Sequence, residues 1–466
     1  MAGFFRVPIR RQQVLLFVVD LGLLLLSLML AFVIARFARF NILFVLDRFT
    51  VACVIYFTVY CLVLFVGQLY DVENRGKEMR SFLYIAGLVL AANLVISMAY
   101  YFLPTWRIAR RVMAIQAPLA LLFIYLWRRI YALVSGGLMT ARRVLLVGAG
   151  ETVASLVADF RAGYAPEFEI IGIVDDDPSA GHGFGSVPML GGTESLKEIA
   201  ARERIEIIVF SPGYRLAANG HTVRNVLELK ARGVKVYELA TFYMRITGKV
   251  PVRYIEDQWL LFSQDFAGID GSERTNLKRL MDIVIASGAL IMLFPLMLIV
   301  AILVRVTSRG PVMYRQERVG LDKRPYRLLK FRTMRADAER AGEPRWASKH
   351  DDRVTAVGRI LRRLRFDEIP QFINVLRGEM SVIGPRPERP FFVEQLEKEI
   401  PYYALRFSAK PGLTGWAQVN YKYGASVEDA HTKLQYDLYY IQEMSLFLDL
   451  VILLKTFQTV LFHPGY

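Results

Sequence analysis

"NLKRLMDIVIASGALIMLFPLMLIVAILVRVTSRGP" spans residues 276–311, and this apolar stretch decides how the C-terminal part of the chain meets a membrane. Residues 283–304 carry no charge, and they exceed the ~20 residues that a helix needs to cross a bilayer core. Pro295 lies near the middle, where a proline removes a helix hydrogen bond and clashes with the preceding turn. We therefore expect a kink or a break at Pro295.

The flanking charges favour a re-entrant hairpin over a kinked fifth crossing of the membrane. Both ends carry the basic residues that mark a cytoplasmic side, namely Lys278, Arg279, Arg305 and Arg309. Each half of the stretch would form a helix of ~18 Å, which is too short for a core of ~30 Å. A fifth crossing would also place the downstream region across the membrane from the domain before it. We therefore predict a re-entrant membrane helix at 280–304.

Residues 1–137 are predicted to form a membrane α-helical bundle of four transmembrane helices. Four apolar stretches are long enough to cross, at roughly 14–35, 49–70, 82–103 and 112–133. Arginines before the first stretch favour a cytoplasmic N-terminus, and an even number of crossings returns the chain to the cytoplasm. Asp20 lies inside the first stretch, where it either faces the bundle interior or has a function.

The overall composition agrees with a membrane protein that handles anions. The 466 residues are 54% hydrophobic with a mean hydropathy of +0.32, which is too apolar for an ordinary soluble protein. The net charge of +15 indicates nucleic acid, anionic lipid or phosphorylated small molecules as partners. Cys53 and Cys61 lie in one apolar stretch and the five histidines show no paired pattern, which argues against disulfides and zinc.

Residues 138–250 are predicted to form a Rossmann-like α/β domain, followed by a linker at 251–274. From Arg142, "RRVLLVGAGETVASLVADF" has the pattern strand, glycine turn, helix, and strands then alternate with helices as in a parallel doubly wound sheet. Gly148, Gly150 and Asp175 are candidate nucleotide-binding residues, because they match two glycines and the acid of a dinucleotide fingerprint. The third glycine is missing, so a scaffold or regulatory module that kept the turn is the alternative.

Two adjacent carboxylates, Asp367 and Glu368 of "RFDEIPQ", follow the basic and apolar run "RVTAVGRILRRLR". That run has its apolar residues on one helical face, which suits a membrane interface, although a core-packed helix with a solvated basic face fits equally well. Adjacent residues on a helix point about 100° apart, so the two carboxylates suit two different roles. One can attack phosphorus and the other can hold Mg²⁺ beside substrate phosphates.

Four cations are candidates for binding those phosphates: Lys330, Arg332, Arg365 and Arg386. The prolines of "GPRP" at 384–387 would stiffen the backbone around Arg386 and so fix its guanidinium. In "KPGLTGW" the glycines Gly412 and Gly415 indicate a flexible surface loop and Trp416 an interfacial anchor, with a plain turn and a packed tryptophan as the alternative.

These motifs resemble a known family. "KFRTM" at 330–334, "DDRVTAVGRILRRLRFDEIPQFINVLRGEMSVIGPRPERP" at 351–390 and "KPGLTGWAQVN" at 410–420 are similar to the bacterial sugar transferases of exopolysaccharide synthesis. These are polyprenyl-phosphate hexose-1-phosphate transferases, or monotopic phosphoglycosyl transferases. The resemblance covers residues 275–466, which we expect to form a mostly α-helical catalytic domain.

The resemblance implies transfer of a sugar 1-phosphate from a UDP-sugar to undecaprenyl phosphate, with UMP as the second product. It implies that Asp367 is the nucleophile, that Glu368 is the ligand of a Mg²⁺ cofactor and that Pro295 is the break of the re-entrant helix. The reaction would start the synthesis of an exopolysaccharide, O-antigen or capsule at the cytoplasmic face of the bacterial inner membrane. A homodimer in contact with inner-membrane lipid is expected on the same ground.

Two other function classes fit part of the sequence. A membrane-tethered nucleotide-sugar oxidoreductase or epimerase would need an intact glycine fingerprint and a Tyr-x-x-x-Lys pair, and residues 142–245 contain neither. A non-catalytic scaffold of a polysaccharide export complex gives no role to the carboxylate pair or the "GPRP" loop. Nucleic acid is not expected, because the basic residues lie largely beside apolar segments, where lipid headgroups explain them. The sequence does not indicate which sugar is transferred.

Overall fold

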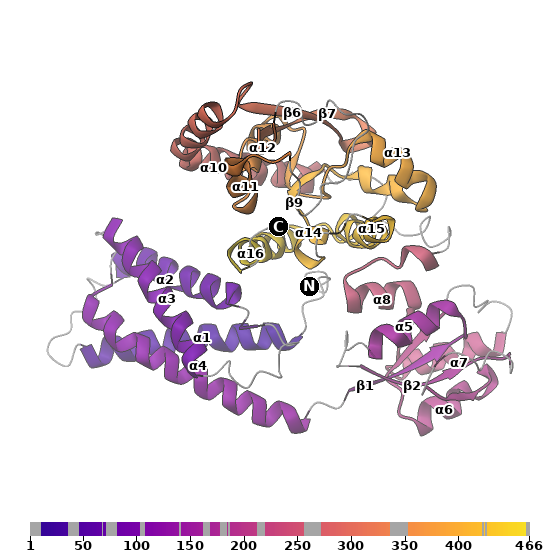
Figure 1. Ribbon diagram of the computed structural model, residues 1–466. Coiled ribbons are helices and arrows are strands. Elements are labelled where there is room, and N and C mark those ends of the chain that lie inside the picture. Colours follow the sequence, from indigo (N-terminus) through magenta and orange to yellow (C-terminus); the bar gives the residue numbers. More distant parts are fainter. Residues whose placement is uncertain are drawn as a thin grey trace. The chain divides into compact units, whose positions relative to one another are not determined.

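The computed structural model describes residues 11–35, 46–67, 69–70, 82–102, 108–138, 141–161, 168–177, 184, 187–211, 220–255, 272–335, 353–421, 424 and 426–462. The described residues divide into two compact units, one within Ile9–Thr140 and the other within Ala141–Tyr466. Figure 1 shows both units, with their helices and several of their strands labelled.

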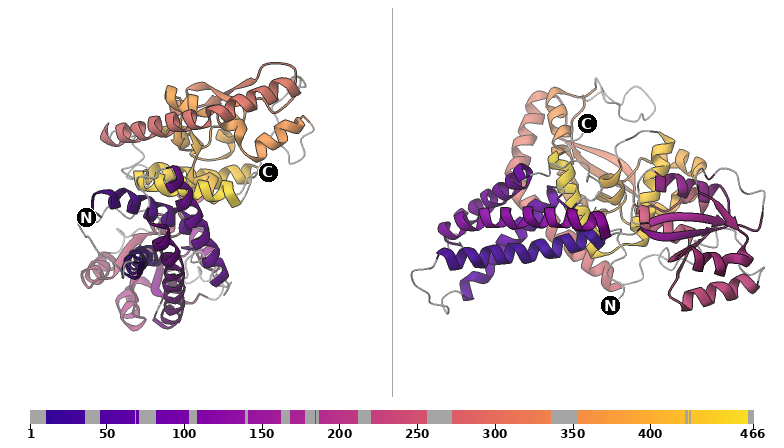
Figure 2. Two further views of the ribbon diagram at one scale, coloured as in Figure 1. Left: turned by 90° about the vertical axis from the view of Figure 1, so that its left-hand side faces the viewer. Right: turned by 90° about the horizontal axis from the view of Figure 1, so that it is seen from below.

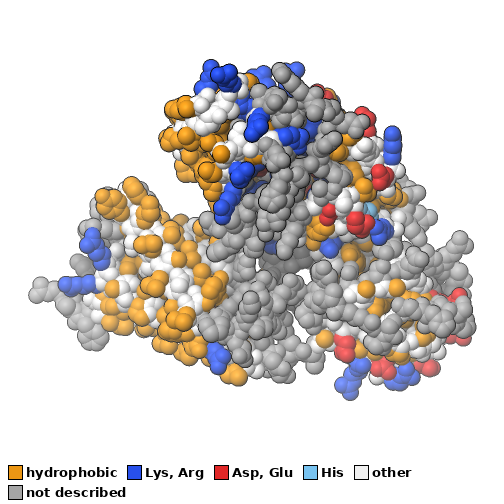
Figure 3. Space-filling model, in the orientation of Figure 1, with side chains coloured by type: hydrophobic (Ala, Val, Ile, Leu, Met, Phe, Trp, Pro, Cys, Tyr) orange, Lys and Arg blue, Asp and Glu red, His pale blue; other side chains and the backbone are white. Residues whose placement is uncertain are grey.

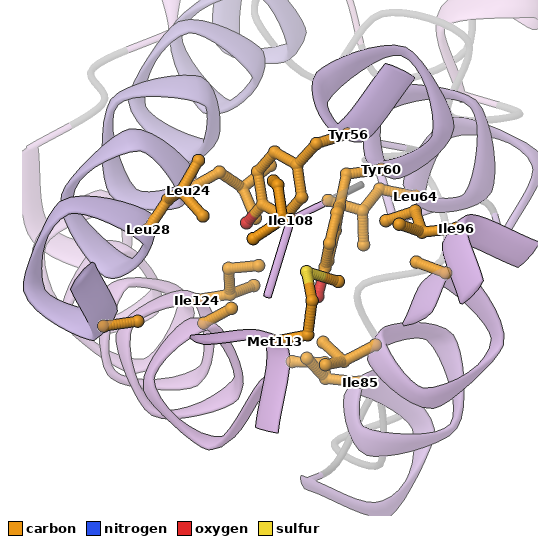
Figure 4. Packing of buried hydrophobic residues seen from close by; sticks show 14 of the residues in the cluster. Leu24, Leu28, Tyr56, Tyr60, Leu64, Ile85, Ile96, Ile108, Met113 and Ile124 are labelled. Carbon is orange, nitrogen blue, oxygen red and sulfur yellow. The ribbon is translucent and has the colours of Figure 1, made fainter. Parts of the chain in front are cut away.

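The first unit is a bundle of four apolar helices, α1 (Arg11–Ala35), α2 (Leu46–Val66), α3 (Phe82–Phe102) and α4 (Arg110–Leu138). Helix α1 packs against α4, and α3 contacts both α2 and α4. Tyr56 and Tyr60 are fully buried among aliphatic side chains at the centre (Figure 4). The outer surface is also apolar, since Leu83, Leu94 and Leu133 are 72%, 73% and 81% exposed. An apolar exterior around an apolar core is the arrangement that a bilayer covers.

The four predicted N-terminal helices are confirmed as apolar helices. Val14–Ala35, Phe82–Phe102 and Arg110–Leu133 are long and apolar enough to cross a membrane, while the apolar part of α2 is shorter, at Val51–Val66. A further candidate span, Asn276–Thr307, lies in the second unit.

Polar side chains inside the bundle pair with one another. Asp20 is buried and forms an ion pair of 2.5 Å with Arg128, so it faces the bundle interior. Gln116 accepts a hydrogen bond from the hydroxyl of Tyr60 at 3.2 Å and donates to that of Tyr56. Because an unpaired polar group is costly in a bilayer, these pairs fix how the helices meet.

The middle domain contains one parallel sheet with the strand order β3-β2-β1-β4-β5. Its strands are β1 (Arg142–Val147), β2 (Phe168–Val174), β3 (Met189–Gly191), β4 (Ile207–Phe210) and β5 (Lys235–Glu238). Its helices are α5 (Glu151–Arg161), α6 (Leu196–Arg202), α7 (Gly220–Ala231) and α8 (Leu239–Thr247).

Helices cover both faces of this sheet. On one face Val144 and Leu146 pack against α5 and α8. On the other face Leu145 and Val147 pack against α6 and α7. The doubly wound sheet predicted from the alternating strands and helices is therefore confirmed.

The C-terminal domain is mostly helical. Its helices are α10 (Ser272–Thr307), α11 (Ala356–Arg363), α12 (Gln371–Arg377), α13 (Pro390–Glu399), α14 (Trp416–Asn420), α15 (Val427–Gln442) and α16 (Leu446–Phe462). The short strands β6 (Met313–Val319) and β7 (Pro325–Phe331) form an antiparallel hairpin, and β8 (Ser381–Ile383) pairs with β9 (Gly412–Thr414) in parallel.

Helix α10 is one uninterrupted helix with Pro295 inside it, so the break expected at Pro295 does not divide it into two helices (Figure 2). Most of its surface is bare and apolar, with Ile291 at 77% and Val306 at 79% exposed. Figure 3 shows hydrophobic side chains gathered over this helix and over the four-helix bundle. The bare face of α10 is the part of this domain that lipid must cover.

The basic helix α11 packs one apolar side against α10 and leaves another apolar residue exposed. Leu361 is buried and Val357 packs beside it, against Val300 and Val304 of α10. The core-packed alternative is therefore correct for this side of the helix. Ile360 is 61% exposed, so a second apolar side is left uncovered.

Candidate active site

Asp367 and Glu368 lie in a short turn between two helices. After α11 the backbone reverses at Arg365, which has a left-handed φ of 56°, and Phe366–Glu368 then form one 3₁₀ turn. Pro370 is the N-cap of α12, so the proline starts the next helix. Because a 3₁₀ helix has three residues per turn, neighbouring side chains point about 120° apart. The two carboxylates therefore face different surroundings.

Glu368 is held by cations from three segments of the chain. Its Oε1 accepts from the Nζ of Lys330 at 3.3 Å and from the Nη2 of Arg386 at 2.8 Å, and Arg365 lies 4.0 Å from its Oε2. The side chain of Glu368 is 13% exposed. Burial alone would raise the pKa of Glu368, but the charges of Arg386, Lys330 and Arg365 hold it well below its usual range. Glu368 is thus ionised at neutral pH.

Asp367 is 8% exposed, and its pKa is shifted in the opposite direction. Burial raises the pKa of Asp367, and the negative charge of Glu368 raises it further. Lys330, Arg362 and Arg386 oppose this shift without cancelling it. The ionised form of Asp367 is therefore destabilised, which is the condition of a reactive nucleophile.

The backbone that carries Arg386 is fixed at three consecutive carbonyls. The oxygen of Pro385 accepts from Gly412 N at 2.8 Å, that of Arg386 from Arg406 Nη2 at 3.0 Å, and that of Pro387 from Arg318 Nη1 at 2.9 Å. The prolines were predicted to stiffen this backbone. Hydrogen-bond donors from β6, from β9 and from the segment before β9 also hold it in place.

Arg406 and Arg318, which the sequence analysis did not single out, hold the backbone on either side of the Arg386 carbonyl. Arg406 is buried, and its Nη2 also bonds Asp437 Oδ2 of α15 at 2.8 Å. Burial raises the pKa of Asp437 and the charge of Arg406 lowers it. The net result is a pKa raised to about 6. Within their own stretches of sequence these residues are ordinary charges, so only their contact in space reveals the role.

The contacts of Arg332 among the described residues are to Ser308 and not to the carboxylates, and its predicted phosphate-binding role stays a prediction. Its Nη2 bonds the backbone oxygen and the hydroxyl of Ser308, at 2.9 and 2.8 Å. Ser308 directly follows α10, where helix carbonyls lack partners and attract a cation. Lys330, Arg365, Arg386, Asp367 and Glu368 are brought together as predicted.

The glycines of "KPGLTGW" are required by close packing rather than by flexibility. A side chain at Gly412 would begin 2.1 Å from Gly384 N, and one at Gly415 would begin 2.2 Å from Gly384 O. Trp416 is buried and its Nε1 donates to Gly248 O at 2.9 Å, so the packed alternative is correct and the interfacial anchor is wrong. This packing holds β9 against the loop of Arg386.

The donor set suits Mg²⁺ only in part. No cluster of three or more metal-ligating side chains occurs among the residues that the structure describes. The Oε1 of Glu368 is engaged by two cations, whereas its Oε2 lies 4.0 Å from Arg365. One available carboxylate oxygen fits Mg²⁺, because this ion takes one or two carboxylates and completes its shell with substrate phosphates and water.

The candidate nucleotide-binding residues meet at the carboxyl end of the central strands. Gly148 has a φ of 91°, and its N donates to Val174 O at 2.8 Å. The Oδ2 of Asp175 accepts from Ala149 N, and its Oδ1 accepts from Asp177 N at 2.8 Å. In a dinucleotide site this part of the loop faces the pyrophosphate. In this chain the carboxylate of Asp175 accepts a hydrogen bond from the loop at Ala149 N.

Comparison with known proteins agrees with the geometry. Residues 273–463 match the family model described as bacterial sugar transferase, and residues 68–211 match that described as CoA-binding domain. The chain is 32% identical over 357 residues to UDP-glucose:undecaprenyl-phosphate glucose-1-phosphate transferase of Escherichia coli K12, which covers 71% of this chain and 74% of the relative.

Two other relatives carry N-acetylgalactosamine and glucose in their names. UDP-N-acetylgalactosamine-undecaprenyl-phosphate N-acetylgalactosaminephosphotransferase of Aeromonas hydrophila is 43% identical over 231 residues, 49% of this chain and 52% of the relative. The chain thus spans about half the length of that relative. Undecaprenyl-phosphate glucose phosphotransferase of Komagataeibacter xylinus is 30% identical over 342 residues, 69% of this chain and 59% of the relative.

The two carboxylates are expected to affect stability in opposite directions. Glu368→Gln leaves Lys330 and Arg386 without their anion and should cost about 3 kcal/mol. Asp367→Asn removes a buried charge whose ionised form is disfavoured, so stability should stay level or rise by up to about 1 kcal/mol. Thermal unfolding of the purified variants measures both changes in stability. Glu394→Gln, at an exposed position of α13, is the matched control. A larger loss for Asp367→Asn than for Glu368→Gln would contradict these surroundings.

Proposed function

Because the chain belongs to the bacterial sugar transferase family, the undecaprenyl-phosphate sugar-1-phosphate transferases, we propose that it moves a sugar 1-phosphate from a UDP-sugar to undecaprenyl phosphate. The products are undecaprenyl diphosphate-sugar and UMP, and the step initiates synthesis of a polysaccharide. One observation carries the proposal: a buried carboxylate, Asp367, lies beside a second carboxylate that Lys330 and Arg386 neutralise.

In the first half of the reaction an Oδ atom of ionised Asp367 attacks the phosphorus that carries the sugar. The bond between this phosphorus and the oxygen that bridges to the second phosphate breaks, and that oxygen leaves with UMP. An acyl phosphate then joins Asp367 to the sugar. Negative charge moves from the carboxylate onto phosphate oxygens, where Lys330 and Arg386 are placed to stabilise it.

In the second half a phosphate oxygen of undecaprenyl phosphate attacks the same phosphorus. The bond to Asp367 breaks, the carboxylate is restored and the diphosphate product forms. Glu368 keeps the cations in place through both halves, since its own charge is held by three of them. The fixed carbonyls around Arg386 keep its guanidinium from moving as charge shifts.

We propose Mg²⁺ as the cofactor, with the Oε2 of Glu368 as its protein ligand. When bound, the ion would neutralise charge on the transferred phosphoryl group. The remaining ligands would be phosphate oxygens of the donor and water. This also gives Glu368 a role distinct from the attack by Asp367.

We further propose that α10 enters the membrane and returns to the same side through a bend at Pro295 that does not interrupt the helix. Near its start Arg279 donates to Val375 O and Leu376 O at 2.6 and 2.7 Å, and Asp282 accepts from Val382 N at 2.9 Å. Near its end Val304 packs against Phe331 and Leu361. Because both ends hold the same domain, a helix that crossed the bilayer would have to pull one end away.

The same reasoning gives the location and partners. Basic residues at both ends of α10 favour the cytoplasmic face of the inner membrane, where UDP-sugars are available. A homodimer is expected from family resemblance. In the middle domain, the hydrogen bond from Ala149 N to the carboxylate of Asp175 favours a scaffold over a dinucleotide site.

Release of UMP tests the reaction. The purified full chain would receive undecaprenyl phosphate, Mg²⁺ and, one at a time, UDP-glucose, UDP-galactose and their N-acetylated forms. One sugar should yield UMP, with a loss of about a hundredfold or more in Asp367→Asn and in Glu368→Gln. Glu394→Gln should behave as wild type. If no UDP-sugar yields UMP, or if Asp367→Asn retains full activity, the proposed reaction is wrong.

The dependence of the rate on pH tests the role of Asp367 separately. Attack needs the ionised carboxylate, so the rate should rise with pH through the raised pKa of Asp367 and then level off. Arg362 lowers this pKa, so Arg362→Gln should move the rise to higher pH. Exposed Arg363→Gln is the matched control and should leave it in place. An unchanged profile in Arg362→Gln would assign the rise to another group.

Labelling of single cysteines tests the path of α10. In a chain with Cys53→Ala and Cys61→Ala, cysteines would replace Leu277 before the apolar part and Arg309 after the helix, both of which are exposed. A reagent that cannot cross the membrane, added to intact spheroplasts, should label neither until the membrane is opened. Labelling of one of the two in intact spheroplasts would show a crossing instead.

A further inference from the structure

A cavity of about 600 Å³ opens beside the β6–β7 hairpin and the end of α12. Five of its lining side chains are cationic: Arg315, Arg324, Arg327, Arg377 and Lys410. In the described lining Glu379 is the one carboxylate, and its Oε2 already accepts from Asn374 Nδ2 at 2.6 Å. We call this site the arginine cavity.

The arginine cavity is separate from the catalytic carboxylates. Neither they nor Lys330 or Arg386 belong to its described lining. Strand β7 divides the two sites, because successive side chains of a strand point to opposite faces. Lys330 reaches Glu368, whereas its neighbour Leu329 lines the cavity. The binding of a ligand in the cavity therefore does not require the carboxylate pair.

Gly378 of the lining lies near two cations, Lys410 of the lining and Arg279 of α10. A side chain there would begin 3.6 Å from the guanidinium of Arg279 and 3.9 Å from the ammonium of Lys410. Glycine, with a φ of 81°, leaves this space open between two cations. Burial and the charge of Arg279 lower the pKa of Lys410, and Asp282 offsets this only in part, so an anion between the two cations would be stabilised.

The end of α12 would ordinarily repel an anion, because helix carbonyls point outward there. Arg279 cancels this effect, since its guanidinium bonds the oxygens of Val375 and Leu376 at 2.6 and 2.7 Å.

We propose that the arginine cavity binds a phosphate-bearing ligand, in addition to the substrates handled at Asp367 and Glu368. Arginine forks match phosphate oxygens in pairs, and the net charge of the lining calls for a ligand with more than one negative charge. The volume exceeds that of one phosphate and suits a nucleotide or a lipid headgroup. Both sources can reach it, because the cavity is open and Arg279 precedes the apolar part of α10.

The test uses the full chain in phosphatidylcholine nanodiscs and two double variants. Arg327→Gln with Arg377→Gln removes two exposed cations of the cavity, and Arg202→Gln with Lys398→Gln removes two exposed cations elsewhere. One arm measures the affinity for UMP and for inorganic pyrophosphate in solution. The other arm measures the binding of phosphatidic acid added to the nanodisc.

The cavity variant should bind at least one probe about tenfold more weakly, while the control variant binds as wild type does. Loss for the soluble probes identifies a free phosphate ligand, and loss for phosphatidic acid identifies a lipid headgroup. Equal affinities in the cavity variant and the control, in both arms, would overturn the proposal. Because binding is measured without transfer, this result is independent of whether the chain releases UMP.

Discussion

The Oε1 atom of Glu368 is the point on which the site depends. It accepts from Lys330 of β7 and from Arg386 of the "GPRP" loop, so one carboxylate oxygen joins two segments to the turn after α11. Two cations held this close would repel each other without it. The contacts continue outward, because Arg406 holds the carbonyl of Arg386 and Asp437 holds Arg406. A local charge balance thus fixes how these segments meet around the two carboxylates.

The same balance separates the roles of two adjacent carboxylates. Glu368 takes up the nearby positive charge and stays ionised, so Asp367 is left buried beside a negative neighbour. The free energy of an ionised group in that position falls when its charge moves to another atom. Attack on a phosphate would do this, since it turns the carboxylate into an acyl phosphate and transfers charge to phosphate oxygens near Lys330 and Arg386. The geometry therefore suits phosphoryl transfer better than proton transfer between the pair.

Periodicity and motifs predict most of the fold and part of the site. The four N-terminal helices and the doubly wound sheet follow from apolar patterns, and Lys330 and Arg386 follow from their motifs. Contacts between distant residues leave no such pattern. The pair of Arg406 and Asp437 and the bonds of Arg332 to Ser308 are set by tertiary packing. Trp416 looked like an interfacial residue because the sequence does not show that Gly248 offers it a buried acceptor.

The most direct measurement is the intact mass of the protein after incubation with its UDP-sugar and Mg²⁺ but without undecaprenyl phosphate. The account predicts an added mass of one sugar phosphate, located on the peptide that contains Asp367 and lost when undecaprenyl phosphate is supplied. Asp367→Asn should carry no such mass. Release of UMP by a wild-type protein that never gains this mass, or an equal gain in Asp367→Asn, would contradict the central claim that Asp367 is the nucleophile.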